Sequence, residues 1–344
     1  MLCIIIFILF LLFFPIGMFS KAYRTLFKKA WLCAFKKITL KPCDENFGDE
    51  VKNLLLGKLF FKFPRFAKFL DKTMTFWAIL FVIISLWSLL YTANAGLNLW
   101  VYDTCNPTNG ESCSLGGESC GLNSAQAPSI FETISRIPEK FKNWDSKEYI
   151  SETASYYNQF DPAKPTAVEF IDPGCRFCKK LWGNIKDAKF QDEYNLTYVV
   201  YPIPQASNDS GYHFQHSYYI ASILEATKIS PKPERPISDV PSDWKLLDKI
   251  FTDQAENTDL QNAINTLYSK EEVTQLIVKY LSEFGYNDAQ IGEIQKIAES
   301  KQVKESLEKQ ALIVTDKLKT VKIPTIVFEG KRYDRVIDKN TLLK

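Results

Sequence analysis

Apolar side chains are distributed unevenly along the 344 residues of the chain. Residues 2–19 are almost wholly apolar, and residues 73–102 contain no charged side chain. An uninterrupted apolar run of roughly 20 residues is typical of a helix that spans a membrane. From residue 129 onward, short apolar runs alternate with charged and turn-forming residues. The pattern therefore predicts transmembrane segments at 1–20 and 73–100, followed by a globular domain.

Each apolar segment has an alternative interpretation. For residues 1–20 it is a cleaved signal peptide, which requires a basic start and a small-residue cleavage site. Neither feature is visible, so we expect a retained segment, although the sequence alone does not decide its retention. For residues 73–100 the alternative is a buried helix of a soluble protein, which so long an uncharged run disfavours.

Charge is also distributed unevenly. The net charge is +2, but residues 21–72 hold 13 Lys or Arg against 5 Asp or Glu. By the positive-inside rule this basic loop is cytoplasmic, so the chain after residue 102 is extracytoplasmic. Residues 51–70 mix Leu and Phe with Lys and Arg, which favours a helix on the inner membrane surface that Pro64 breaks or kinks. A plain basic loop is the alternative. We expect a cell-membrane protein that contacts lipids and binds no nucleic acid.

Residues 101–128 form a linker rich in Asn, Gly and Ser. This composition predicts a flexible, extracytoplasmic segment. The linker contains Cys105, Cys113 and Cys120, an odd number of cysteines on the oxidising side of the membrane. Either two of them pair with each other, or one pairs elsewhere, for example with Cys3. The sequence leaves this pairing open.

Residues 129–344 have the element pattern of an α/β domain. Aromatic residues at helical spacing over 131–160 predict helix with a buried aromatic face. A strand–helix–strand unit follows, then a long helical insertion at about 205–318, and finally two strands joined by a Gly turn. The core elements that we expect are strands at 167–171, 196–203, 322–328 and 332–337 and a helix at 176–190.

Cys175 and Cys178 carry the candidate chemistry, because they lie three residues apart at the predicted start of a helix. The positive end of a helix stabilises a thiolate, so we expect Cys175 to be the exposed nucleophile and Cys178 the sheltered resolving thiol. Arg176 adds a positive charge that should lower the pKa of Cys175. The alternatives are a zinc site completed by His213 and His216, or a purely structural disulfide.

Three features of the domain lie far apart in the sequence but resemble features of one protein family. The motif Phe170-x-Asp-Pro-x-Cys-x-Phe-Cys-Lys-x-x-Trp182 is similar to the active-site signature of the DsbA, DsbC and DsbG relatives. Ile323-Pro324-Thr325 resembles the cis-proline loop of the thioredoxin fold, and the stretch at 205–318 resembles the DsbA helical insertion. Residues 129–344 thus resemble the DsbA-type disulfide oxidoreductases, including their membrane-anchored forms.

The resemblance implies a thioredoxin fold with a large helical insertion, preceded here by two transmembrane helices. It implies a cis peptide bond before Pro324 and contacts of Ile323 and Thr325 with a bound substrate strand. It also implies that Glu169 is a buried carboxylate that assists proton transfer at the buried cysteine. The alternative for Glu169 is a solvent-facing side chain.

Arg176 and Phe177 stand where the family usually has His or Pro between its two cysteines. We expect this pair to tune the redox potential, so the direction of electron flow stays open.

The expected function is that of a membrane-tethered, extracytoplasmic thiol–disulfide oxidoreductase. It donates a Cys175–Cys178 disulfide to thiols of secreted or surface proteins, and the resemblance implies reoxidation by a quinone-linked membrane partner. We expect no metal and no cofactor. A disulfide reductase or isomerase that uses the same dithiol is one alternative, and a non-catalytic thioredoxin-fold binding module is another.

Overall fold

The computed structural model describes residues 64–102, 119–121, 129–230, 240–320 and 322–343. The chain divides into two compact units, Met1–Ala93 and Asn94–Lys344. The predicted segment at 1–20, most of the basic loop at 21–72 and most of the linker at 101–128 lie outside the described residues.

Helix α4 (Pro64–Tyr102) contains the whole uncharged stretch at 73–102. Pro64 is its first residue, a position that proline tolerates well because the missing N–H has no partner there in any helix. Proline therefore starts this helix, and the predicted surface helix at 51–70 lies mostly outside the described residues. Among the residues that the structure describes, no helix combines the length and the apolarity needed to cross a membrane.

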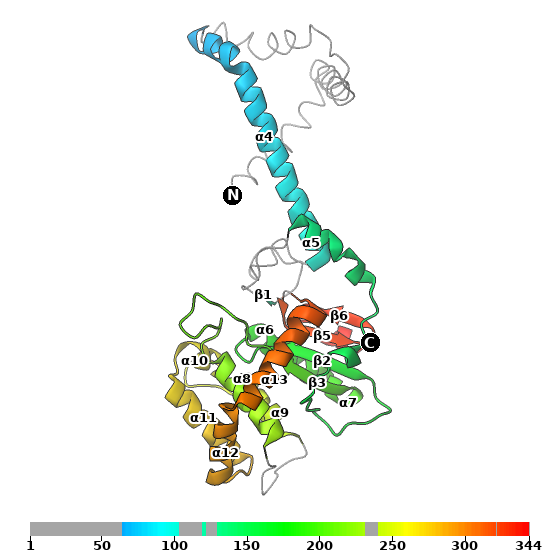
Figure 1. Cartoon of the computed structure of the whole chain (residues 1–344), viewed down its shortest axis with the longest axis vertical. Helices are drawn as coiled ribbons and strands as arrows, with labels where there is room; N and C mark the ends of the chain where they lie inside the picture. Colours follow the sequence, from blue (N-terminus) through cyan, green and yellow to red (C-terminus); the bar gives the residue numbers. More distant parts are fainter. Residues whose placement is uncertain (1–63, 103–118, 122–128, 231–239, 321, 344) are drawn as a thin grey trace. The chain divides into compact units, whose positions relative to one another are not determined.

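A four-stranded sheet forms the centre of the second unit, with strand order β3-β2-β5-β6 (Figure 1). Strand β2 is parallel to β3 and antiparallel to β5, and β6 is antiparallel to β5. This mixed order, with a helix between the two parallel strands, is the arrangement of the thioredoxin fold. The four strands are β2 (Thr166–Ile171), β3 (Asn195–Val200), β5 (Thr325–Phe328) and β6 (Lys331–Tyr333).

Strands β2 and β3 are buried along their whole length, because helices cover both faces of the sheet. Helix α6 connects these two strands, and α13 packs against β3. The helices around the sheet and in the insertion are α6 (Arg176–Ala188), α7 (Phe190–Glu193), α8 (Ser217–Ile229), α9 (Ser242–Thr252), α10 (Leu260–Thr266), α11 (Lys270–Glu283), α12 (Asp288–Ala298) and α13 (Lys301–Leu312). The π-helical turn η3 (Ile313–Leu318) ends the insertion, close to the predicted boundary.

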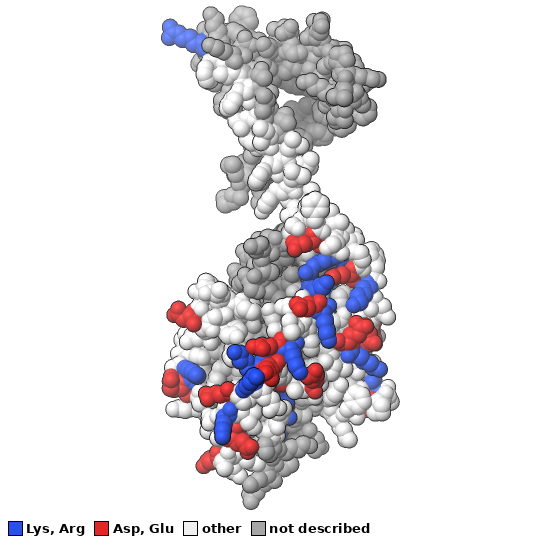
Figure 2. Space-filling model, in the orientation of Figure 1, with Lys and Arg blue, Asp and Glu red and all other residues white. Residues whose placement is uncertain are grey.

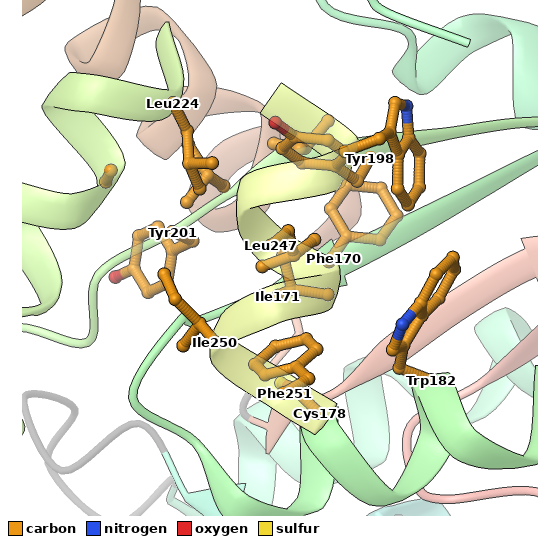
Figure 3. Packing of buried hydrophobic residues seen from close by; sticks show 14 of the residues in the cluster. Phe170, Ile171, Cys178, Trp182, Tyr198, Tyr201, Leu224, Leu247, Ile250 and Phe251 are labelled. Atoms are coloured by element: carbon orange, nitrogen blue, oxygen red, sulfur yellow. The ribbon is translucent and has the colours of Figure 1, made fainter. Parts of the chain in front are cut away.

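The insertion shares one hydrophobic core with the sheet. Figure 3 shows Leu247, Ile250 and Phe251 of α9 beside Phe170 and Ile171 of β2. The insertion therefore does not form a separate domain.

A pair of tryptophans holds α9 against α6. Trp182 stacks on Trp244 with 5.3 Å between ring centroids, and its indole N–H donates to Asp248 at 2.7 Å. These contacts fix α9, and with it the insertion, on the helix that begins at the cysteine motif.

The predicted helix over 131–160 is wrong for most of its length. Only α5 (Ile130–Ser135) is α-helical there, and the short 3-10 turns η1 (Ile137–Phe141) and η2 (Ser146–Tyr149) follow it. Pro138 lies at the start of η1, where its ring is incompatible with continuing α5. Phe131 and Phe141 are about four-fifths exposed, so the aromatic spacing does not mark one buried face.

The second unit closes with α14 (Lys339–Leu342), which packs against α6. Asn184 donates to the carbonyl of Ile337 at 2.8 Å and ties this C-terminal segment to α6. Acidic and basic side chains are intermixed on the face of the second unit that Figure 2 shows, without a broad field of one sign.

Candidate active site

The cysteine motif begins where β2 turns into α6. Asp172, Pro173 and Gly174 form the turn, and Cys175 is the N-cap of the helix. The carbonyl of Cys175 accepts hydrogen bonds from the backbone N–H of Cys178 at 3.0 Å and of Lys179 at 3.2 Å. The predicted position of the cysteine pair at a helix start is therefore confirmed.

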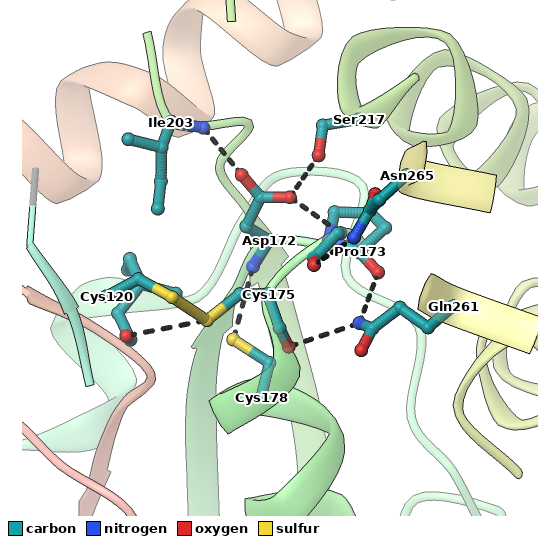
Figure 4. Close-up of a disulfide and its surroundings, with 11 residues drawn as sticks. Cys120, Asp172, Pro173, Cys175, Cys178, Ile203, Ser217, Gln261 and Asn265 are labelled. Atoms are coloured by element: carbon teal, nitrogen blue, oxygen red, sulfur yellow. Dashed lines mark hydrogen bonds between the residues drawn. A yellow bond between two sulfur atoms is a disulfide. The ribbon is translucent and has the colours of Figure 1, made fainter. Parts of the chain in front are cut away.

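Cys175 forms a disulfide with Cys120, and Cys178 is a free, buried thiol (Figure 4). In this structure Cys175 is therefore bonded to Cys120 and not to Cys178, so a Cys175–Cys178 disulfide stays a prediction. The predicted exposure of Cys175 is wrong, because the residue is fully buried. The reason is that the short strand β1 (Cys120–Gly121) lies over Cys175 and delivers the third sulfur. Of the other linker cysteines, Cys105 and Cys113 lie outside the described residues.

The predicted cis peptide bond joins Ile323 to Pro324. The carbonyl oxygen of Ile323 lies 3.8 Å from the Cys175 sulfur, so the cis-proline loop meets the cysteine motif as expected. Ile323 and Lys322 form the short strand β4 (Lys322–Ile323), which pairs antiparallel with β1.

Thr325 has a different place from the one predicted for a substrate contact. It is fully buried, and its hydroxyl lies 2.8 Å from the Lys322 carbonyl and 2.8 Å from the Asp334 carboxylate. Thr325 thus holds the cis-proline loop through buried hydrogen bonds, whereas the backbone of Ile323 is the part that meets an extended strand.

Glu169 is buried in the middle of β2, and the solvent-facing alternative is excluded. Burial raises the pKa of its carboxyl to about 8, because a charge in this apolar strand is poorly solvated. Its Oε1 atom is buried without a hydrogen-bond partner. At neutral pH Glu169 is therefore mostly protonated and able to exchange a proton.

The thiol of Cys178 is held in the same environment. Burial raises its pKa well above the ordinary value, the N–H of Asp172 at 3.5 Å lowers it, and the charges of Glu169 and Asp172 raise it. Cys178 is therefore a protonated thiol at neutral pH and needs a proton acceptor before it can attack.

Asp172 holds several parts of the site together, although the sequence offers it only as one position of the cysteine motif. Its carboxylate accepts the N–H of Gly174 at 2.8 Å, the N–H of Ile203 at 2.7 Å and the hydroxyl of Ser217. Burial raises the pKa of Asp172 to about 6, although these three hydrogen bonds lower it. The side chain thereby fixes the turn that carries Cys175.

Helix α10 of the insertion holds the same turn from the other side. The Gln261 amide donates to the carbonyls of Pro173 at 2.7 Å and Cys175 at 3.1 Å, and Asn265 donates to Gly174 at 2.8 Å. Local spacing could not reveal these residues, because nearly 90 positions separate them from the motif.

Gly174 is required by the close approach of Phe214. A Cβ atom at this position would overlap the Phe214 side chain, which lies in the loop before α8. Only glycine leaves room for that contact.

Arg176 and Phe177 lie beside the cysteines and line a cleft of about 1230 Å³. The Arg176 guanidinium is 4.7 Å from the centroid of the Phe177 ring. Their effect on the redox potential stays a prediction. The described residues contain no group of three or more His, Cys, Asp or Glu side chains that could hold a metal ion.

No protein-family model and no curated protein matches the sequence. Solved structures do match. The thiol-disulfide exchange protein alpha-DsbA2 from Wolbachia pipientis is 18% identical, with 57% of this chain and 87% of that chain covered and a TM-score of 0.37. MdbA, a thiol-disulfide oxidoreductase from Corynebacterium diphtheriae, is 12% identical, with 57% and 92% covered and a TM-score of 0.37. Oxidised BdbD from Bacillus subtilis is 18% identical, with 56% and 92% covered and a TM-score of 0.38.

Proposed function

We propose that this chain is a thiol–disulfide oxidoreductase whose reacting residues are Cys175 and Cys178. One observation carries the proposal: Cys175 caps α6 directly against the cis-proline loop, with the Cys178 thiol buried one turn further along the helix. A sulfur at a helix start leaves readily as a thiolate, and a neighbouring thiol can release whatever is bonded to it.

The direction that we propose is disulfide donation. With Cys175 bonded to Cys178, a substrate thiolate attacks the Cys175 sulfur, and Cys178 leaves as a thiolate. A second substrate thiol then attacks the mixed disulfide, and Cys175 leaves. The substrate gains a disulfide, and the protein gains two thiols. Glu169 supplies the proton that Cys178 takes up, which its raised pKa allows near neutrality.

We also propose that the domain acts on secreted or surface proteins, is tethered to the cell membrane through residues 1–20 and 73–100, and is reoxidised by a quinone-linked membrane partner. The uncharged run at 73–102 and the basic tract before it support the tether and the extracytoplasmic side. Extraction of membranes at high pH tests it, because a tethered chain stays in the pellet and an untethered one is released.

Two measurements on the full-length chain test the catalytic proposal. The reduction potential of the Cys175–Cys178 couple should lie near about −120 mV for an oxidant, whereas about −270 mV would identify a reductase. The double variant Cys120→Ser/Cys178→Ala, in which Cys175 cannot stay bonded to Cys120, should trap covalent complexes with secreted proteins. The same variant with Cys175→Ala added serves as the control that cannot. Absence of trapped partners would favour the non-catalytic binding module.

A further inference from the structure

Strand β1 lies at the edge of the active site where a substrate strand is expected. Its two residues pair antiparallel with β4, with Cys120 opposite Ile323 and Gly121 opposite Lys322. Ser119 and Gly121 are buried, so this segment is seated in the site and does not pass over its surface. The chain thus presents an extended cysteine-containing peptide of its own to the cis-proline loop.

The three sulfurs of the site are arranged as in a trapped exchange reaction. Cys120 is bonded to Cys175, which is the proposed attacking cysteine. Cys178 retains its thiol, and Figure 4 shows its sulfur pointing toward the Cys120–Cys175 disulfide. A mixed disulfide with a substrate has this same arrangement, with an external sulfur in place of Cys120.

We propose that Cys120 is a third redox cysteine of this site, and that residues 119–121 are an internal substrate which closes the active site through an intramolecular mixed disulfide. The inference rests on the proposed thiol–disulfide chemistry of Cys175 and Cys178. In the closed state Cys175 is bonded to Cys120, and in the open state it is bonded to Cys178.

The interconversion is balanced without an external oxidant or reductant. The Cys178 thiol gives up its proton and attacks the Cys175 sulfur. The Cys175–Cys178 bond forms as the Cys120–Cys175 bond breaks, and Cys120 leaves as a thiolate that takes up a proton. One disulfide and one thiol are present before and after the exchange.

A buried proton carrier is available for this step. Glu169 lies on β2 close enough for its charge to act on the Cys178 thiol, and its carboxyl is buried and incompletely hydrogen-bonded. A static cross-link between the linker and the domain would need neither this carboxyl nor a free thiol beneath the disulfide.

The closed state has a direct consequence for substrates. Cys175 is fully buried in it, and the backbone of Ile323 is already paired with Cys120. A peptide from another protein can reach neither group until residues 119–121 leave. The rate of reaction with an external thiol is therefore reduced in proportion to the fraction of closed molecules.

Disulfide mapping of the full-length protein tests the closed state. Acid quenching, alkylation and mass spectrometry of unreduced peptides should find the Cys120–Cys175 link in wild type. Cys178→Ser, which cannot resolve it, should hold nearly all molecules in that form. Cys120→Ser should contain only the Cys175–Cys178 link. If Cys178→Ser contains no Cys120–Cys175 peptide, the inference is overturned.

Reaction with a reduced dithiol peptide tests the effect on activity. If about nine-tenths of wild-type molecules are closed, Cys120→Ser should oxidise the peptide about tenfold faster. Gly121→Pro keeps the cysteine but disfavours pairing of β1 with β4, so it should raise the rate in the same direction. Cys113→Ser is the matched control from the same linker and should leave the rate unchanged.

The outcomes separate the two proposals. Equal rates for wild type and Cys120→Ser, or an equal acceleration by Cys113→Ser, would overturn the role of Cys120 while leaving the oxidoreductase intact. A Cys120→Ser protein that holds the Cys175–Cys178 disulfide but oxidises no peptide would overturn the proposed function itself, while the mapping still decides whether Cys120 pairs with Cys175.

Discussion

Two buried glutamates of the second unit, Glu169 and Glu225, have opposite hydrogen-bond and charge environments. Glu225 on α8 accepts from Ser306 at 2.5 Å and from Gln310 at 3.0 Å, and Lys228 lies 3.3 Å from it. Glu169 on β2 has an oxygen without any partner. Both side chains are almost completely inaccessible to solvent.

The pKa values diverge accordingly. Burial alone raises the pKa of Glu225, but the charge of Lys228 and hydrogen bonds from Ser306, Thr153 and Gln310 bring it below the ordinary value. For Glu169 burial acts alone and raises the pKa to about 8. Hydrogen-bond and ion-pair partners keep the buried carboxylate of Glu225 charged, and it serves the structure. Without such partners the buried carboxyl of Glu169 holds a proton that it can exchange.

Glu225→Ala should have the largest effect, because it leaves buried Lys228 without the carboxylate that lies 3.3 Å from it. Breaking a buried ion pair in this way costs about 3–5 kcal/mol of the free energy of unfolding. Urea denaturation at pH 7 measures the loss. Glu152→Ala, which breaks the exposed pair with Lys309, is the control and should change stability little. Equal effects of the two variants would show that Glu225 has no special structural role.

Glu169→Gln should raise the free energy of unfolding at high pH, whereas Glu225→Ala lowers it. A folded-state pKa raised to about 8 from 4.5 means that the folded protein keeps a proton which the unfolded chain loses, so wild-type stability falls as pH rises through that window. The neutral Gln removes this loss, so the variant should be more stable than wild type at pH 9 and the difference should shrink as pH falls to 5.

The same variant should resolve mixed disulfides more slowly, by about tenfold or more, because Gln cannot carry the proton of Cys178. Denaturation between pH 5 and 9 and single-turnover exchange with a peptide are the two measurements. A Glu169→Gln protein that is unchanged in both would remove the contrast between the two glutamates.

Asp172→Asn should have an intermediate effect. The amide can accept at only one of the two carboxylate oxygens, so its NH₂ group faces either the N–H of Ile203 or the donors of Gly174 and Ser217. We expect a loss of about 1–2 kcal/mol in the free energy of unfolding, together with weaker protection of the Cys178 thiol from alkylation. The exposed Asp187→Asn on α6 is the matched control. Unchanged alkylation of Cys178 would show that the turn does not depend on Asp172.

Ser306→Ala should have the smallest effect, about 1 kcal/mol, because it removes a single hydrogen bond to Glu225. The dependence of stability on pH has the opposite sign from the dependence that Glu169 produces. The lowered pKa of Glu225 contributes stability above its unfolded value that is lost as pH falls through the folded value. The variant should therefore lose stability at a higher pH during acid titration. Denaturation between pH 3 and 7 measures this shift, and an unshifted midpoint would contradict it.

Much of the site could be predicted because its signals are local. The apolar run of β2, the turn after it and the cysteines at the start of α6 are consecutive in sequence. The cis bond before Pro324 and the burial of Glu169 were expected from the family resemblance, and both are present. The aromatic spacing at 131–160 gave a wrong prediction, since it has a helical period although only α5 at its start is α-helical.

By itself the sequence determined which residues can do thiol chemistry: a strand, a turn and a helix start place Cys175 and Cys178, and this follows from short-range periodicity and turn chemistry. Only the tertiary structure decided which sulfur Cys175 holds and which side chains secure its turn. Cys120 lies 55 residues away, and Gln261 and Asn265 lie still further along the chain. Contacts over such separations depend on how β1 pairs with β4 and how the insertion packs on α6, and no local pattern encodes that geometry.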